Sequence, residues 1–161
     1  MCLIIDANLA GSVFSDTPTA DFLPLIDWLT SPRKDGKLVV GGHLAKELDK
    51  IGSARRFVRS LQQAGRARSI PSDATDSETE NIKTSCISND PHVIALARLS
   101  GARILCSQDK NLHKDFTNTS LVSTPQGRVY QNATHIGLLR THGHTAACKQ
   151  EIGKSKKQGR P

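Results

Sequence analysis

The sequence has few aromatic residues, no closely spaced cysteine pair and no long apolar run. Aromatic side chains make up only 4% of its 161 residues, so we expect a core built mainly from leucine, isoleucine, valine and alanine. Such a core favours an α/β domain over a β-sandwich, whose strands usually carry more aromatic residues. Every apolar run is shorter than the roughly 20 residues of a transmembrane helix. A signal peptide has a basic segment before its apolar run, and this sequence has none before its first run. We therefore expect a soluble, cytoplasmic protein that does not contact a membrane.

The four cysteines are scattered along the chain, and no two of them form a C-x-x-C pair. A zinc ribbon or a disulfide framework needs closer, paired spacing. Most of the four lie in or beside apolar runs, where a free cysteine behaves as a small hydrophobic residue. We therefore expect all four to be reduced, with mainly structural roles: Cys2, Cys86, Cys106 and Cys148.

The chain is basic, with a net charge of +7 that is unevenly distributed. Its last thirteen residues contain five basic side chains and one acidic side chain, so they carry four of these charges. We expect a globular domain over residues 1–141 and a basic, flexible tail over 142–161. A basic tail either binds phosphates or only keeps a protein soluble, and its charge alone does not distinguish between these two roles.

The tail also contains an H-x-H-x-x-x-C pattern, which is weak evidence for a transition-metal site. We favour a phosphate-binding arm built from the lysines of this segment, because clustered positive charge in a polar terminus attracts nucleic-acid phosphates. The lysines expected to contact RNA are Lys154, Lys156 and Lys157.

Short apolar runs alternate with helical patterns along the chain. Between the runs, apolar residues three and four positions apart predict amphipathic helices. Residues 71–81 are acidic and begin with a proline, so we expect a loop there that leads into a helix. This alternation predicts a parallel sheet with right-handed crossovers, and therefore an α/β fold, a three-layer α/β/α sandwich with a central parallel sheet. The strands are expected at 2–6, 37–42, 67–70, 103–107 and 120–123.

Four acidic residues occur near the ends of these predicted strands. Asp6 and Asp109 follow strands directly, so they are expected at the same edge of a parallel sheet. Glu47 and Asp90 lie near helix starts that can face the same crevice. Crowded carboxylates repel one another, and hard divalent cations such as Mg²⁺ or Mn²⁺ remove that repulsion. We expect His92, two positions after Asp90, to face elsewhere, which argues against zinc.

Each acid also has an ordinary structural explanation. Asp90 and Asp109 are well placed to cap helices, and Glu47 alone would usually lie on a solvated helix face. Asp6 is harder to explain in this way, because an acid that ends a fully apolar strand needs a partner. The four together favour a metal-binding pocket.

Four blocks of the sequence resemble, in order, the blocks of PIN-domain nucleases. They are LIIDANLAGSVF, HLAKELDK, SNDPHVIALARLSGARIL and CSQDKNLHKDF, and the resemblance covers roughly residues 2–130. It implies a sheet in the order 3-2-1-4-5 and a metal-dependent endoribonuclease that leaves a 5′-phosphate and a free 3′-hydroxyl. The residues it implies as catalytic and as ligands of Mg²⁺ or Mn²⁺ are Asp6, Glu47, Asp90 and Asp109.

The resemblance implies further roles and partners. Asn8 and Ser107 would orient carboxylates or waters from outside the ligand set. Asp115 could supplement Asp109, although we favour a structural role for it. The substrate would be RNA, and the chain would be either the toxin half of a toxin–antitoxin pair or a stress or defence ribonuclease. In the first case its partners would be an antitoxin protein and a second copy of the chain in a homodimer.

Two other classes of function compete with this interpretation. One is a non-catalytic RNA-binding or scaffold module of the same fold. The other is a phosphatase or phosphotransfer receiver, which we rank low because the first block reads D-A-N where a haloacid-type phosphatase needs D-x-D.

Overall fold

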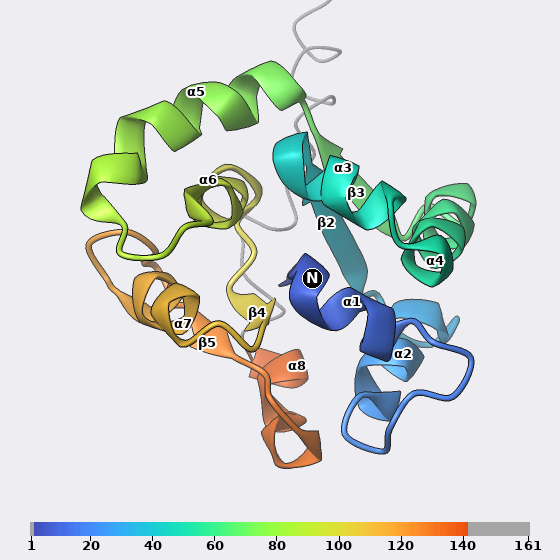
Figure 1. Ribbon diagram of the computed structural model, residues 1–161. Coiled ribbons are helices and arrows are strands. Elements are labelled where there is room, and N and C mark those ends of the chain that lie inside the picture. The colour runs from blue at the N-terminus through green and yellow to red at the C-terminus, as the bar shows by residue number, and fades with distance from the viewer. Residues whose placement is uncertain (1, 142–161) are drawn as a thin grey trace, which may run out of the picture.

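The computed structural model describes residues 2–141, and Figure 1 shows an α/β fold around one five-stranded sheet. All strand pairs are parallel, and the strand order is β3-β2-β1-β4-β5. The predicted fold class and the strand order implied by the resemblance are both confirmed. The strands are β1 (Cys2–Ile5), β2 (Lys37–Gly41), β3 (Ala67–Ile70), β4 (Ile104–Cys106) and β5 (Arg128–Val129).

Helices cover both faces of this sheet and complete a three-layer sandwich. In Figure 1, α5, α6 and α7 lie on one side of the strands, and α2, α4 and α8 lie on the other. None of the described helices is long and apolar enough to cross a membrane. The α-helices are α1 (Ala7–Val13), α2 (Leu23–Thr30), α3 (Gly42–Asp49), α4 (Gly52–Gln63), α5 (Ser72–Ile82), α6 (Pro91–Ser100), α7 (Lys110–Thr117) and α8 (Gly137–Thr141), with 3₁₀ turns η1 (Lys83–Ser85) and η2 (Ala133–His135).

The centre of the fold is β1 with α6. All four residues of β1 are fully buried, as expected for a central parallel strand that is covered on both faces. Helix α6 begins with Pro91 at its first position and ends at Gly101, whose φ of 81° is the left-handed conformation that glycine adopts without strain.

Two of the sequence predictions about the elements are wrong. Residues 120–123 form no strand, because the N–H groups of Leu121 and Val122 both donate to the Asn118 carbonyl in a turn. The fifth strand is β5, where the N–H groups of Arg128 and Tyr130 donate to the carbonyls of Arg103 and Leu105.

The acidic segment at 71–81 is also not a loop but lies mostly in helix α5. Thr75 is fully buried and Ile82 nearly so, seven positions apart on one face of this helix. Asp73, Asp76 and Glu80 are exposed, so the helix has a narrow buried stripe that composition alone did not reveal.

The expectation of four reduced cysteines is wrong for Cys2, which is disulfide-bonded. Cys86 and Cys106 carry free thiols, in a partly buried and a buried position. The predictions for the tail over 142–161, including Lys154, Lys156 and Lys157, lie outside the described residues.

Candidate metal site

Asp6 leaves the sheet at the carboxyl end of β1. Ile5 pairs with Cys106 in β4, so the next residues of the two strands, Asp6 and Ser107, emerge side by side. The Asp6 residue is only 4% exposed, and the Ser107 hydroxyl donates a 2.8 Å hydrogen bond to its Oδ2. The carboxylate is therefore buried and held in one orientation at the predicted edge.

Burial raises the pKa of the Asp6 carboxyl, and neighbouring carboxylates raise it further. Desolvation is the largest cause, and the negative charges of Asp90 and Glu47 act in the same direction. The Ser107 hydrogen bond opposes them by stabilising the ionised form. Asp90 and Glu47 therefore lie close enough to Asp6 for their charges to act on it.

Ser107 and Asn8 connect the two chain segments that carry the acids. The Ser107 Oγ accepts a 3.0 Å hydrogen bond from the Asp109 N–H while it donates to Asp6. The Asn8 Oδ1 accepts from the Gln108 N–H at 3.4 Å. Both residues hold the loop after β4 against the start of α1, and Ser107 also contacts the Asp6 carboxylate.

The two presumed helix caps differ. The Asp109 Oδ1 accepts from the N–H groups of Asn111 and Leu112, at 2.9 Å and 3.2 Å, and so caps α7. Asp90 occupies the N-cap position of α6, but its side chain accepts no hydrogen bond from the described N–H groups of that helix. Helix capping therefore explains one carboxylate oxygen of Asp109, and it does not explain the side chain of Asp90.

Glu47 is carried to the site by an abrupt turn from β2 into α3. Gly42 begins α3 with a φ of 52°, and a Cβ on it would lie 2.9 Å from the Thr75 side chain, so this position requires glycine. Glu47 follows on the face of α3 that is turned towards α6.

The expectation that His92 faces away from the acids is wrong. Its Nε2 lies 3.1 Å from the Glu47 Oε1, and its side chain is 9% exposed. On the other side, the His43 Nε2 lies 3.8 Å from the Glu47 Oε2. Glu47 is therefore not on a solvated face but between two imidazoles. The H-x-x-x-E spacing of His43 and Glu47 was a signal in the sequence, since residues four apart share a helix face.

Asp115 has a structural role, as favoured, although it is buried and not solvated. Its carboxylate accepts hydrogen bonds from the N–H groups of Ile87 and Ser88, which lie just before Asp90. It therefore holds the segment that leads into α6. Burial, with the nearby Asp115 charge, raises the pKa of the Cys86 thiol to about 11.

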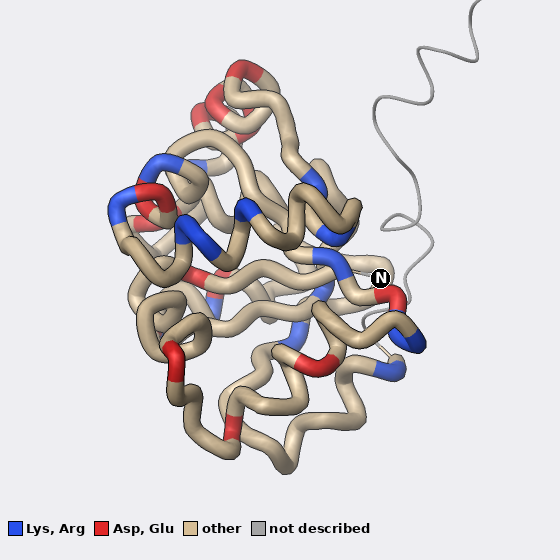
Figure 2. The backbone as a smooth tube through the Cα atoms, turned by 90° about the vertical axis from the view of Figure 1, so that its right-hand side faces the viewer, with Lys and Arg blue, Asp and Glu red and all other residues tan. Residues whose placement is uncertain are grey.

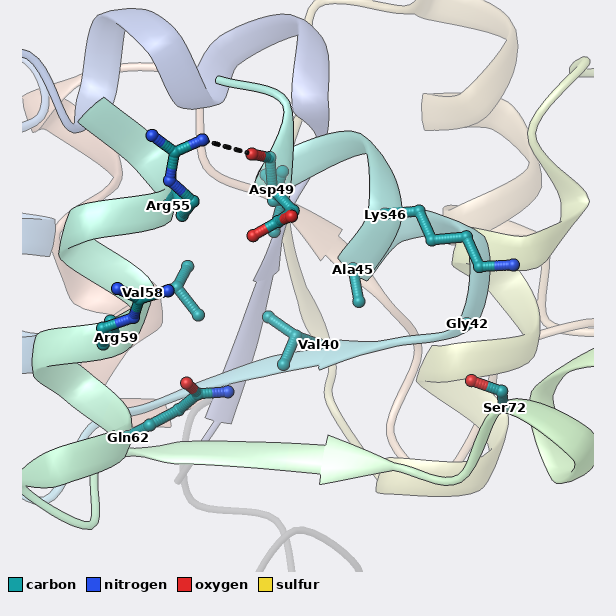
Figure 3. Close-up of a pocket in the computed structure, with 11 residues that line it drawn as sticks. Val40, Gly42, Ala45, Lys46, Asp49, Arg55, Val58, Arg59, Gln62 and Ser72 are labelled. Atoms are coloured by element: carbon teal, nitrogen blue, oxygen red, sulfur yellow. Dashed lines mark hydrogen bonds between the residues drawn. The ribbon is translucent and has the colours of Figure 1, made fainter. Parts of the chain in front are cut away.

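A separate pocket of about 360 Å³ lies between α3 and α4, and Figure 3 shows its lining. None of the four acids is among the described residues that line it. Its rim is basic: Lys46 comes from α3, and Arg55 and Arg59 come from α4. Arg55 is oriented by a 3.1 Å hydrogen bond to the Asp49 carbonyl, drawn in Figure 3.

Acidic side chains are concentrated on α5. In Figure 2 red segments gather at the top of the molecule, and blue segments lie below them with further red segments among them. The exposed acids of α5 include Asp73 and Asp76. Phosphates would be repelled from α5 and attracted to the basic rim of the α3–α4 pocket.

No family model, curated protein or solved structure matches this chain. The case for a function therefore depends on the residues of the site and on the resemblance of its sequence blocks.

Proposed function

We propose that this chain is a metal-dependent endoribonuclease that hydrolyses RNA phosphodiester bonds and uses Mg²⁺ or Mn²⁺. One observation carries the proposal: the buried Asp6 carboxylate lies at the carboxyl edge of β1 with its pKa raised by burial and by two further acids, Asp90 and Glu47. A protein maintains such a mutually repulsive group at a cost in stability, which is typical of functional sites.

The donor set fits a hard cation. Asp6, Glu47, Asp90 and Asp109 offer carboxylate oxygens, the ligands that Mg²⁺ and Mn²⁺ prefer. A cation beside Asp6 would offset the repulsion from Asp90 and Glu47. Such an ion, when bound, lowers the pKa of a water and stabilises a leaving oxygen. Ser107 favours the ionised form of Asp6 by donating to its Oδ2.

The residues have separate roles in this proposal. Asp6, Asp90 and Asp109 hold the cation, and Glu47 reaches a second cation or a water. Asn8 orients the loop after β4 through its contact with the Gln108 N–H. The Asp109 oxygen that caps α7 is already engaged, so Asp109 contributes through its other oxygen.

RNA is the proposed substrate because the α3–α4 pocket is lined by three basic side chains and one acidic side chain, Asp49. Lys46 precedes Glu47 in α3, and Arg55 and Arg59 stand across the pocket from it. These side chains, with the lysines of the tail, would contact phosphates on either side of the cleaved bond. The biological setting proposed is a toxin bound by an antitoxin and active as a homodimer, or a stress or defence ribonuclease.

The test is cleavage of a labelled RNA pool by the purified full chain. Cleavage is expected with Mn²⁺ or Mg²⁺, is expected to stop with EDTA, and is expected to be abolished by Asp6→Asn. Asp76→Asn is the matched control, because it removes an exposed carboxylate of α5 away from the site. Cleavage that persists in EDTA or in Asp6→Asn would contradict the proposal.

A non-catalytic RNA-binding or scaffold module is the second candidate. The observation in its favour is that Asp109 uses one carboxylate oxygen to cap α7, which weakens it as a metal ligand. This candidate predicts RNA binding without cleavage, and no heat of Mn²⁺ binding in titration calorimetry.

A further inference from the structure

Two histidines and a glutamate converge from two helices at the side of the carboxylate site. His43 and Glu47 are four residues apart on α3, and His92 lies in the first turn of α6. We propose that these three side chains form a binding site for a transition-metal cation of the Zn²⁺ class, distinct in its chemistry from the hard-cation site. Their ligand atoms all lie within 4.8 Å of one another.

The spacing of these atoms suits a tetrahedral ion. Zn²⁺ binds imidazole nitrogen and carboxylate oxygen at about 2.0–2.2 Å, so the ligand atoms of a tetrahedral site lie roughly 3.3 Å apart. The Glu47 carboxylate is 3.1 Å from the His92 Nε2 and 3.8 Å from the His43 Nε2. Small rotations of the exposed His43 side chain would close the longer distance.

A simple hydrogen bond does not account for the whole cluster. A bond between Glu47 and His92 would satisfy the buried imidazole by itself. That hydrogen bond does not involve His43, which lies four residues before Glu47 on α3 and brings its Nε2 to the same carboxylate from a side chain that is 63% exposed. The two rings also meet edge-on, with centroids 4.7 Å apart and an angle of 79°, so both imidazoles gather around one point.

The ligand types determine which ion the site selects. Imidazole nitrogen favours Zn²⁺, Cu²⁺ and Ni²⁺ over Mg²⁺ and Mn²⁺, which prefer oxygen. Two histidines and one glutamate leave a fourth position open, as in sites where zinc also holds a water. Excess Mg²⁺ should therefore not displace the ion.

Glu47 belongs both to this cluster and to the carboxylate site, since its charge acts on Asp6. An ion held by the histidines would withdraw Glu47 from the acids. If the chain is the nuclease proposed above, Zn²⁺ should therefore inhibit the Mg²⁺-dependent reaction. This consequence rests on the proposed function, whereas the binding of the ion does not.

The test is calorimetric titration of the full chain with Zn²⁺ in the presence of millimolar Mg²⁺, without RNA. One tight equivalent is expected for the wild type. His43→Asn should weaken that binding at least about 100-fold, because loss of an outer partner alone typically costs 10–100-fold. His43 is exposed, so this variant should fold, and equal thermal melting without metal would verify this.

Two controls separate this site from other histidines. His135→Asn removes an imidazole that contacts Tyr130 and the Gln131 N–H, and it should retain the tight equivalent. The double variant of the tail, His142→Asn with His144→Asn, should retain it as well. Absence of a tight equivalent, or its loss with the tail histidines and not with His43, would overturn the proposal.

A second measurement reports the ligand set directly. Co²⁺ bound in place of Zn²⁺ should give the strong visible absorption of a tetrahedral site in the wild type and not in His43→Asn. Inhibition by Zn²⁺ is then measured in the RNA assay. A chain that binds Zn²⁺ but cleaves no RNA would disprove the nuclease and leave the metal site standing.

Discussion

Ser107 and Asp6 are 101 positions apart, and the Ser107 hydroxyl donates a 2.8 Å hydrogen bond to the Asp6 carboxylate. The parallel pairing of β1 with β4 makes this contact, because Ile5 opposite Cys106 places the two following residues together. The same hydroxyl accepts from the Asp109 N–H. One serine therefore joins two of the predicted metal ligands.

Ser107→Ala should slow RNA cleavage and move its pH dependence. The hydrogen bond from Ser107 lowers the pKa of Asp6 against the effect of burial, so its removal raises that pKa further. The limb of the pH–rate profile that needs ionised Asp6 should shift to higher pH. Activity at neutral pH should fall about 10–100-fold, as for other residues that orient metal ligands.

The measurement is kcat/KM against pH for Ser107→Ala and wild type. Ser69→Ala, an exposed change on β3, is the control and should match the wild type. A fall in rate with an unshifted pH limb would mean that Ser107 does not act through Asp6.

Asp6→Asn should stabilise the metal-free protein while it abolishes cleavage. A carboxyl whose pKa is raised on folding binds a proton more tightly in the native state, so stability falls as pH rises through the folded pKa. The amide of the variant carries no charge, so burial does not destabilise it in this way. Its side-chain oxygen can still accept the hydrogen bond from the Ser107 hydroxyl. The expected gain at neutral pH is about 0.5–2 kcal/mol, the usual range for single stabilising substitutions.

Urea unfolding in EDTA at several pH values measures this gain. The difference between Asp6→Asn and wild type should grow from acid to neutral pH and shrink when Mn²⁺ is added to both. A variant that is less stable than the wild type at neutral pH would show that the Asp6 charge is not a cost.

Arg55→Gln and Arg59→Gln should each weaken RNA binding without changing Mn²⁺ binding. Both side chains line the basic pocket between α3 and α4. If each contacts one phosphate, each change should reduce the slope of log K against log salt by about 1. Filter binding at several salt concentrations tests this. Arg33→Gln, on the loop at the opposite end of β2, is the control and should leave the slope unchanged.

Arg98→Ala should destabilise the fold, and more at neutral than at acid pH. The Arg98 guanidinium is 2.5 Å from Glu78 and also donates to the Leu121 carbonyl at 2.7 Å. Because the side chain of Arg98 is 37% exposed, solvent screens the pair, and the expected loss is about 1 kcal/mol.

The pH dependence of this effect follows from Glu78. The hydrogen bond from Arg98 is the main cause of the lowered pKa of that carboxyl. The stabilisation is therefore present above the unfolded pKa and is lost as pH falls through the folded pKa. The difference in thermal unfolding between the two proteins should narrow at low pH to the part that comes from the Leu121 contact. A difference that does not change with pH would show that the Leu121 contact alone carries the effect.

Local patterns were sufficient for most of the fold. The apolar runs that became β1, β2 and β4 are continuous because central parallel strands are covered on both faces, and this burial is visible in the residue order. The prediction of a loop over residues 71–81 is wrong, because helix α5 buries a narrow stripe that includes Thr75 and Ile82. The last strand was predicted at 120–123 and lies at Arg128–Val129, since Leu121 and Val122 are buried within a turn.

The sequence by itself determined the alternating α/β architecture and that Asp6 and Ser107 lie at the ends of strands, since these depend on periodicity and chain order. That the two strands are neighbours was implied by the resemblance, and the pairing of β1 with β4 shows it. Only the tertiary structure decided the surroundings of Glu47. His92 is 45 positions away, and it reaches Glu47 because α3 and α6 pack together. It likewise decided that Asp109 caps its helix whereas Asp90 does not. The orientation of a side chain towards a distant partner is set by packing across the core, which no local spacing encodes.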